Sequence, residues 1–249
     1  MDYDGLQASY WQQQIARIEA VRNRIASVNP NQPGRVVSED EDLVIGEGRR
    51  LRMAVLFLDI SDFSGRLSES EEEQTLMLKV LNLFFTEMIK IAEEYGGTVE
   101  KNTGDGLMAY FEDGGGTPSE SGSKRAVASA LTMMAVNDQL IKPILLATPV
   151  PEIKFRISID FGCVTIARLG AARRFNANVA IGATANFASK MLAFAQAGDI
   201  VIGATVRDGL PPAWHQFTQQ MSITTGWVYR KTGSPYLLYK YTGRWKQPA

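Results

Sequence analysis

The sequence contains very few of the residues that build redox centres or soft-metal sites. Its 249 residues include one cysteine, Cys163, and one histidine, His215. A single cysteine cannot form a disulfide within the chain, and this usage favours a reducing cytoplasm. Zinc sites with several Cys or His ligands are excluded, so any metal must be held by carboxylates, which favours Mg²⁺ or Mn²⁺. Cys163 lies in an apolar run, which predicts a small core residue.

A surplus of charge of either sign is also missing. Lys and Arg number 26 against 27 Asp and Glu, and the formal net charge is -1 at pH 7. This balance predicts neither a nucleic-acid partner nor an anionic membrane surface. No apolar run reaches the roughly 18 residues that cross a bilayer, and the first residues lack the basic and apolar regions of a signal peptide. We therefore expect a cytoplasmic protein that binds no membrane.

The chain is long enough for one sizeable core with a small extension, since 45% of its residues are hydrophobic. Apolar residues recur at spacings of three and four over residues 6–28, which predicts an amphipathic helix. That helix either packs on its own domain or contacts a second copy. A connector rich in Pro, Asn and acidic residues follows it. We therefore divide the chain into an N-terminal helix and connector, 1–48, and one folded domain, 49–249.

Within 49–249, short apolar runs alternate with helical patterns. The expected elements are a strand at 52–60, a helix at 70–97, a hairpin at 98–112, a helix at 124–141, two strands within 154–170, a helix at 183–198, a strand at 199–203 and a hairpin at 227–241. The two strands within 154–170 are expected to break at Gly162. This order predicts an α+β domain with a mainly antiparallel sheet and helices packed on one face.

Two aspartates occupy positions suited to metal chemistry. Asp59 ends an apolar strand, and Asp105 lies at the hairpin tip between Gly104 and Gly106. Adjacent strands would bring both carboxylates to one edge of the sheet, where they could hold Mg²⁺ or Mn²⁺ and leave room for phosphate oxygens. The flanking glycines allow a sharp turn and the close approach of a phosphate. From the residues alone, two ordinary turn aspartates explain the pattern equally well.

Three segments resemble motifs of one enzyme family. LFLDISDFSGRL resembles the first metal motif of the class III adenylate and guanylate cyclases, VEKNTGDGLMAYF their second metal hairpin, and IGATANFASKM their transition-state helix. The similarity runs from about Met53 to about Tyr241, and three motifs in the right order are specific where one alone is weak. The resemblance implies a class III cyclase catalytic domain, which closes a nucleoside triphosphate into a 3′,5′-cyclic nucleotide with two Mg²⁺ or Mn²⁺ ions.

The resemblance also implies the roles of individual residues. Asp59 and Asp105 would bind the two metal ions with the main-chain carbonyl of Ile60, and Asn186 would orient the ribose. Lys190 stands where most members carry an arginine on the α-phosphate, so the charge is kept but the bidentate geometry is lost. Asn186 and Lys190 are i and i+4, so they share one helix face.

A phosphate contact and a subunit arrangement follow by the same analogy. Either Arg230 or Lys231 falls near the phosphate-binding lysine of the family, although a solvated tail charge explains each of them as well. In the family, the metal aspartates come from one protomer, and the positions of Asn186 and Lys190 come from the other. This chain carries both sets, so the resemblance implies a homodimer with composite sites.

Two positions read the base in the family, and the second of them departs from the purine pattern in this sequence. Lys101 matches the first, where adenylate cyclases carry lysine and guanylate cyclases glutamate. Val179 stands at the second, where adenylate cyclases usually carry Asp or Thr to accept from the adenine amino group. Valine cannot accept, and an unpaired buried donor costs roughly 1–3 kcal/mol, whereas Lys101 can donate to a carbonyl. Uracil has two carbonyls and no amino group, so we favour UTP over CTP and a pyrimidine over a purine.

These features resemble the bacterial pyrimidine cyclases of the Pycsar antiphage system, whose cyclic UMP or cyclic CMP activates a separate effector. One alternative is an adenylate cyclase that makes cyclic AMP, and another is an inactive nucleotide-binding regulatory module on the same fold. A polymerase-like or diguanylate cyclase palm also uses paired aspartates, but its GG-D/E-E-F signature is missing. Phe57 either lines the nucleotide pocket on the side of Asp59 or belongs to the core.

Overall fold

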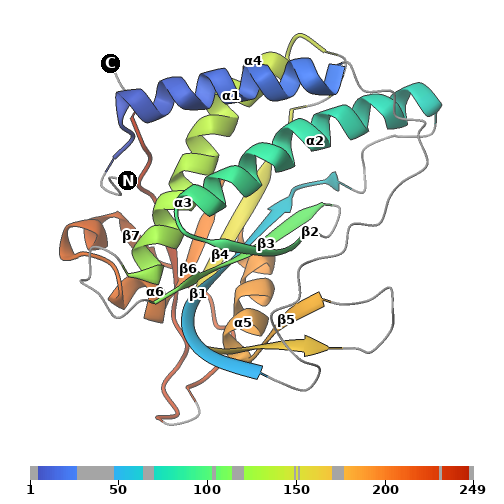
Figure 1. Ribbon diagram of the computed structural model, residues 1–249. Helices are drawn as coiled ribbons and strands as arrows, with labels where there is room; N and C mark the ends of the chain where they lie inside the picture. Colours follow the sequence, from blue (N-terminus) through green and yellow to red (C-terminus); the bar gives the residue numbers. More distant parts are fainter. Residues whose placement is uncertain are drawn as a thin grey trace.

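The computed structural model describes residues 5–26, 48–63, 70–102, 105–113, 121–148, 150, 152–169, 177–229 and 232–246. Within them, helices pack against one large sheet (Figure 1). The strands are β1 Gly48–Ile60, β2 Thr98–Asn102, β3 Gly106–Glu112, β4 Phe155–Leu169, β5 Ala177–Ile181, β6 Ile200–Gly203, β7 Thr218–Gln220 and β8 Leu238–Tyr241. The α-helices are α1 Ala8–Ala26, α2 Glu71–Glu94, α3 Gly122–Val136, α4 Lys142–Leu145, α5 Ala183–Met191 and α6 Ala204–Asp208. None of these helices is both long and apolar enough to cross a membrane.

Strand β1 lies in the interior of the sheet. The strand order is β2-β3-β1-β4-β6-β8-β7, and β5 pairs with the second half of β4. Among the described strands, β4 and β6 run parallel and the other neighbours antiparallel. The predicted α+β class and mainly antiparallel sheet are therefore confirmed. Because β1 pairs with β3 on one side and β4 on the other, its last residues lie between the beginnings of both strands.

Helix α2 begins and ends where its sequence predicts. The Ser70 side chain accepts from the Glu73 N–H at 3.1 Å, and the Glu73 carboxylate accepts from the Ser70 N–H at 3.1 Å. This capping box satisfies donors that the first helical turn leaves unpaired. After the helix the chain turns through Gly96 at φ 70, a left-handed conformation that glycine adopts without a steric penalty.

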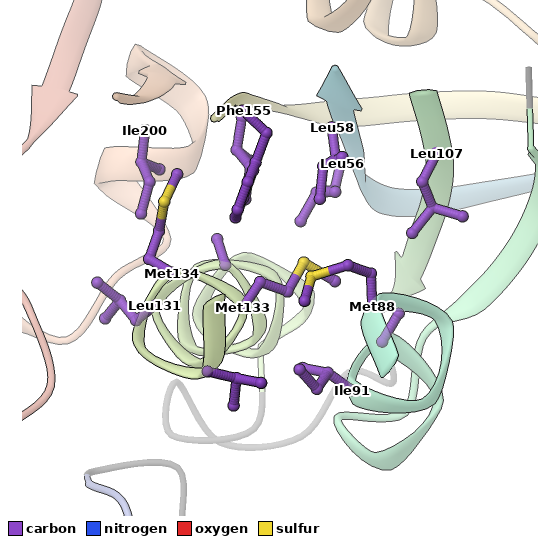
Figure 2. Close-up of a cluster of buried hydrophobic side chains, with 14 of the residues drawn as sticks. Leu56, Leu58, Met88, Ile91, Leu107, Leu131, Met133, Met134, Phe155 and Ile200 are labelled. Carbon is purple, nitrogen blue, oxygen red and sulfur yellow. The ribbon is translucent and has the colours of Figure 1, made fainter. Parts of the chain in front are cut away.

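Both faces of β1 are buried. Leu56 and Leu58 belong to the large hydrophobic cluster between the sheet and helices α2 and α3, and Figure 2 shows α2 and α3 side chains facing those of the sheet. Successive side chains of a strand point to opposite faces. Val55 therefore points to the other face, where it packs in a smaller cluster with Ala185 of α5. The main helical layer covers one face, and the short helix α5 covers part of the other.

Helix α1 packs along α2 on the outer side of the helical layer (Figure 1). Trp11 and Ile18 are buried in the large cluster. Arg17 pairs with Glu87 and Glu94 of α2, with N–O distances of 2.8 and 2.5 Å. Helix α1 thus packs on its own domain, the first of the two interpretations of its amphipathic pattern. The division of the chain at residue 48 stays a prediction.

Two expectations for β4 are wrong. The strand does not break at Gly162, because Gly162 pairs with Met53 inside a continuous ladder. A Cβ at Gly162 would lie 2.5 Å from Thr184 Oγ1, so the glycine allows α5 to approach the sheet. Cys163 is exposed instead of buried. The next residue, Val164, points into the small cluster beneath α5, so strand alternation turns Cys163 to the opposite face.

The predicted hairpin at the end of the chain is present in part. Among the described residues, 227–229 pair antiparallel with 234–236 through a bridge between Val228 and Pro235. Strand β8, which follows, pairs with β6 and β7. The polar sequence of β7 has only three residues and no alternating apolar pattern, so it carries no signal for a strand.

Candidate active site

The ends of β1 and β3 bring Asp59 and Asp105 to one edge of the sheet. Asp59 pairs in register with Gly106, the first residue of β3 and the neighbour of Asp105. The Ile60 N–H also donates to the Asp105 carbonyl at 2.8 Å. The arrangement expected from the sequence, with the two aspartates on adjacent strands, is thus present in the backbone. The hairpin tip residues 103 and 104 lie outside the described residues.

The chain leaves β1 through a tight turn that keeps this edge in place. The Ser61 N–H donates to the Lys154 carbonyl at 2.8 Å, just before β4. Asp62 then has φ 56, in the left-handed region. Aspartate is one of the few residues besides glycine that adopts this region readily. The shape of the turn therefore depends on the left-handed conformation of Asp62. The bond to the main-chain carbonyl of Lys154 attaches the turn to the sheet.

Arg156 is a residue of this site that sequence reasoning missed. It pairs in register with Asp59 across β1 and β4, and its Nε and Nη2 each lie 2.8 Å from Asp59 Oδ2. Its Nη1 also donates to the Ala195 carbonyl at 3.3 Å. The side chains of Asp59 and Arg156 are 23% and 33% exposed, so both can reach a ligand at the surface. The available signal was a cation, Arg156, between the apolar residues Phe155 and Ile157 of a predicted strand.

The donor set suits a hard divalent cation. Asp59 and Asp105 offer carboxylate oxygens and Ile60 a carbonyl oxygen, the ligand type that Mg²⁺ and Mn²⁺ prefer. Within the described part of the chain, no cluster of three or more His, Cys, Asp or Glu forms. A metal at this edge would therefore keep several water or substrate oxygens, as Mg²⁺ does where it binds phosphates.

Helix α5 presents two polar side chains to solvent. Asn186 and Lys190 are both exposed, whereas Ala188 is buried on the sheet side. The Ala188 carbonyl accepts from the hydroxyl of Ser158 on β4 at 2.6 Å, which attaches the helix to the sheet. The predicted shared face of Asn186 and Lys190 is therefore free to meet another molecule. Their roles stay predictions.

The predicted base-reading positions lie on β2 and β5, and a residue in a bulge of β2 bonds to β5. Val99 pairs with Ala109 and Lys101 with Met108, so Glu100 is an extra residue in the ladder. The Glu100 carboxylate accepts from the Ala180 N–H at 2.9 Å, next to Val179 in β5. Glu100 precedes Lys101 and Ala180 follows Val179, so this hydrogen bond links β2 to β5 next to both predicted base-reading positions. The side chains of Lys101 and Val179 lie outside the described residues, and sequence reasoning missed Glu100.

The other predicted residues are only partly described. Phe57 is half-buried and packs against the small cluster of Met53 and Val55, on the face of β1 that Asp59 also occupies. This packing agrees with the core interpretation and leaves its role toward a nucleotide a prediction. Arg230 and Lys231 lie outside the described residues.

Comparison with protein families identifies the family of this domain. The family described as "Adenylate and Guanylate cyclase catalytic domain" matches residues 48–232. The chain belongs to this family. The match includes both strand ends that carry Asp59 and Asp105 and the whole of α5, so the predicted class III cyclase family is confirmed.

Curated relatives of this cyclase domain are considerably longer proteins. An adenylate cyclase of Anabaena cylindrica is 29% identical over 154 residues, which cover 61% of this chain and 29% of the relative. An uncharacterized protein of Mycobacterium tuberculosis is 29% identical over 178 residues, which cover 70% of this chain and 29% of the relative. The chain thus spans less than a third of the length of the curated relatives it matches.

Solved cyclase structures share the fold. The guanylyl cyclase Cya2 superposes with a TM-score of 0.65 at 20% identity, over 79% of this chain and 94% of that one. The adenylyl cyclase CyaB from P. aeruginosa superposes with a TM-score of 0.64 at 25% identity, over 82% of this chain and all of that one. Proteins named for different purine substrates therefore share this architecture, and the fold alone does not distinguish between bases.

Proposed function

We propose that the protein is a nucleotidyl cyclase that converts a nucleoside triphosphate, with UTP or CTP preferred, into the 3′,5′-cyclic nucleotide and pyrophosphate. One observation carries the reaction class. Asp59 pairs beside Asp105, and the Ile60 N–H bonds to the Asp105 carbonyl at 2.8 Å, in a chain that belongs to the cyclase family. Metal-assisted phosphoryl transfer depends on positioning and charge stabilisation, so it requires neither a histidine base nor a nucleophilic cysteine.

The residues of the chain supply the positions for this reaction. Asp59, Asp105 and the carbonyl of Ile60 would hold two Mg²⁺ or Mn²⁺ ions, which lower the pKa of the attacking 3′-hydroxyl and neutralise phosphate charge. Arg156 compensates the charge of Asp59 from β4. Once Asp59 is otherwise neutralised, the planar guanidinium can pair with phosphate oxygens instead.

The opposite half of the site would come from a second copy of the chain. Asn186 would orient the ribose, and Lys190 with Arg230 or Lys231 would contact phosphates. Exposure of Asn186 and Lys190 on α5 supports this arrangement, because both side chains are free of their own core.

The preference for a pyrimidine rests on the residues at two positions. Lys101 donates and suits a carbonyl oxygen, whereas Val179 offers no acceptor to an amino group. The hydrogen bond between Glu100 and the Ala180 N–H supports the idea that both positions face one base, because it joins β2 to β5. A cyclic UMP or cyclic CMP product would then act on a separate effector, and antiphage defence is the signalling role that we propose for it.

A cyclic AMP product is the second candidate. It is favoured by the 29% identity to an adenylate cyclase and by the 25% identity to the adenylyl cyclase CyaB. A lysine at position 101 is compatible with adenine as well. Both candidates require Asp59 and Asp105 at the ends of β1 and β3, which we call the metal edge. They differ only in the base that fits near Val179.

A direct assay separates the candidates. The purified chain is incubated with each of the four nucleoside triphosphates and Mn²⁺, and cyclic nucleotide and pyrophosphate are both quantified. We expect UTP to give the highest kcat/KM. Cyclic AMP as the dominant product would refute the pyrimidine preference, and nucleotide binding without pyrophosphate release would favour the inactive module. Val179→Asp is the matched variant, and it should shift the preference toward ATP because it restores an acceptor.

A further inference from the structure

A carboxylate without a role in the metal edge is buried in the middle of the sheet. Asp160 on β4 is 2% exposed. It accepts hydrogen bonds from the hydroxyl of Tyr236 and, at 3.2 Å, from the hydroxyl of Thr205 on α6. A side chain at Gly203 would collide with both Asp160 and the Tyr236 hydroxyl, so the glycine in β6 leaves the space that they occupy. Burying a carboxylate costs folding free energy unless hydrogen bonds compensate for the lost water. The hydroxyl of Tyr236 is the principal donor to Asp160.

Tyr236 also belongs to an aromatic cluster outside the main core. Its ring lies 5.1 Å from Phe187 and 4.8 Å from Tyr229, measured between centroids. Trp227 stacks on Phe187 at 5.1 Å with an interplanar angle of 23°. Phe194 completes this cluster edge-on against Trp227 at 5.8 Å. Such pairs contribute beyond the area that they bury.

The cluster joins two segments that carry predicted site residues. Phe187 is on α5, directly after Asn186 and three residues before Lys190. Trp227, Tyr229 and Tyr236 are in the C-terminal arm, which we define as residues 227–236. The arm also includes Arg230 and Lys231, whose structure lies outside the described residues.

Backbone hydrogen bonds hold the described part of the arm in one conformation. The Tyr236 N–H donates to the Trp227 carbonyl at 2.8 Å, and the Tyr229 N–H donates to the Ser234 carbonyl at 2.9 Å. The Gly233 N–H donates to the Tyr229 carbonyl at 2.7 Å. Apart from the bridge between Val228 and Pro235, no regular strand pairing supports these described residues. The arm is therefore attached at its end through β8, where Leu238 pairs with Gly203 of β6, and elsewhere by side-chain contacts.

We propose that Asp160 and Tyr236 form a positioning pair that locks the C-terminal arm onto α5, so that both segments meet the nucleotide as one unit. This inference rests on the proposed cyclase function. The hydroxyl of Tyr236 attaches the arm to Asp160 in the centre of the sheet. The ring of Tyr236 packs against Phe187, so the arm and α5 hold each other in position. Asp160 and Tyr236 are positioning residues, because they act through Asn186 and Lys190 of α5.

The test compares two matched tyrosine variants. Tyr236→Phe removes only the hydroxyl that donates to Asp160. Tyr95→Phe makes the same change at a buried tyrosine whose hydroxyl bonds to Thr132 Oγ1 at 2.8 Å in the α2–α3 core. Amide hydrogen exchange of the arm, thermal unfolding, KM for the nucleoside triphosphate and Mn²⁺ affinity without nucleotide are measured on both.

For Tyr236→Phe we expect at least about tenfold faster exchange at the amides of Tyr229, Gly233 and Tyr236, since one hydrogen bond to a charged group is lost. KM should rise about tenfold, and Mn²⁺ affinity at Asp59 and Asp105 should change by less than about twofold. Tyr95→Phe should lower thermal stability without either local effect. Should Tyr236→Phe not fold, Asp160→Asn replaces it, because it keeps an acceptor oxygen but removes the charge, and a smaller shift in the same direction is expected.

Four outcomes would overturn the proposal, three from the variants and one from the wild-type chain. Unchanged exchange in Tyr236→Phe would show that the pair does not lock the arm. Faster exchange with unchanged KM would show that the lock does not position the nucleotide, and equal effects in Tyr95→Phe would reduce the pair to general stability. A wild-type chain that neither binds nor cyclises any nucleotide would refute the proposed function and the positioning role together, while the exchange comparison would still decide whether the lock exists.

Discussion

At the scale of single residues, the ends of the strands carry charges that depend on particular partners. Asp59 has two guanidinium contacts from Arg156 to one oxygen, Oδ2, so its carboxylate has a defined orientation. A paired guanidinium and carboxylate of this kind holds geometry as well as charge. Arg156 of β4 therefore fixes the orientation of the Asp59 carboxylate at the edge of the sheet.

Asp59→Asn should abolish turnover while the chain stays folded. The amide keeps the size of the side chain but loses the negative charge that a divalent cation requires. We expect kcat to fall by at least about a thousandfold, measured by pyrophosphate release with Mn²⁺. Asp138→Asn, at an exposed position after α3, is the control and should keep wild-type activity. Wild-type turnover in Asp59→Asn would contradict the metal assignment.

Asp160 should make folding stability depend on pH in the opposite sense to most carboxylates. Burial raises the pKa of Asp160 to about 6, although hydrogen bonds from Tyr236 and Thr205 oppose that shift. An acid with a raised folded pKa binds more protons when folded, so stability falls as pH rises from about 4 to about 6. Two pKa units correspond to roughly 3 kcal/mol at most.

The measurement is the free energy of unfolding in urea between pH 4 and pH 8, for wild type and for Asp160→Asn. The wild type should lose stability relative to the variant across this window, because the amide side chain of the variant carries no charge to bury. Parallel pH profiles for the two proteins would contradict the prediction.

At the scale of elements, α1 is attached to α2 through both apolar and ionic contacts. Glu87 is 1% exposed, and its desolvation raises its pKa, whereas the contacts from Arg17 lower it. Tyr10 also donates to Glu94 at 2.5 Å, and burial is the main cause of the raised pKa of Tyr10. The α1–α2 contact therefore includes a carboxylate that needs its cationic partner.

Arg17→Met should destabilise the chain by about 3 kcal/mol, because it leaves the buried carboxylate of Glu87 without its cation. The free energy of unfolding in urea measures this loss. Lys90→Met is the control, since Lys90 and Glu93 form an exposed pair at 3.4 Å and should contribute less than about 0.5 kcal/mol. Equal losses in the free energy of unfolding for the two substitutions would show that the burial of Glu87 does not determine the effect of Arg17→Met.

The local sequence signals for the elements were good guides to helices and less so to strands. The capped ends of α2 and the apolar run of β1 have local causes, so the pattern predicts them. The continuity of β4 through Gly162 and the existence of β7 depend on neighbouring strands and on α5, so no local pattern shows them. Packing decides these cases because glycine in a strand serves a close approach as readily as a break.

At the scale of the whole molecule, the two halves of the proposed site are an edge and a helix of the same chain. Asp59 and Asp105 lie at the ends of β1 and β3, and Asn186 lies exposed on α5 across the other face of the sheet. A symmetric dimer would bring the edge of one copy to the helix of the other and create two equivalent sites.

Mixing two inactive variants tests this arrangement. Asp59→Asn and Asn186→Ala are each expected to be inactive as homodimers. When subunits exchange, each heterodimer has one intact site and one site with both changes, so about a quarter of wild-type activity should return at full mixing. The rate of cyclic nucleotide formation measures it. No recovery after exchange, verified by mass spectrometry of labelled subunits, would contradict a composite site.

The amino-acid sequence by itself determined the cyclase family and the main elements, because the family motifs, the helix caps and the apolar periodicity each lie in neighbouring residues. Only the tertiary structure decided which distant groups meet. Arg156 contacts Asp59 across 97 positions, Glu100 contacts Ala180 across 80, and Tyr236 contacts Asp160 across 76. Strand register, a bulge and aromatic packing bring these pairs together, and each depends on the whole sheet being assembled.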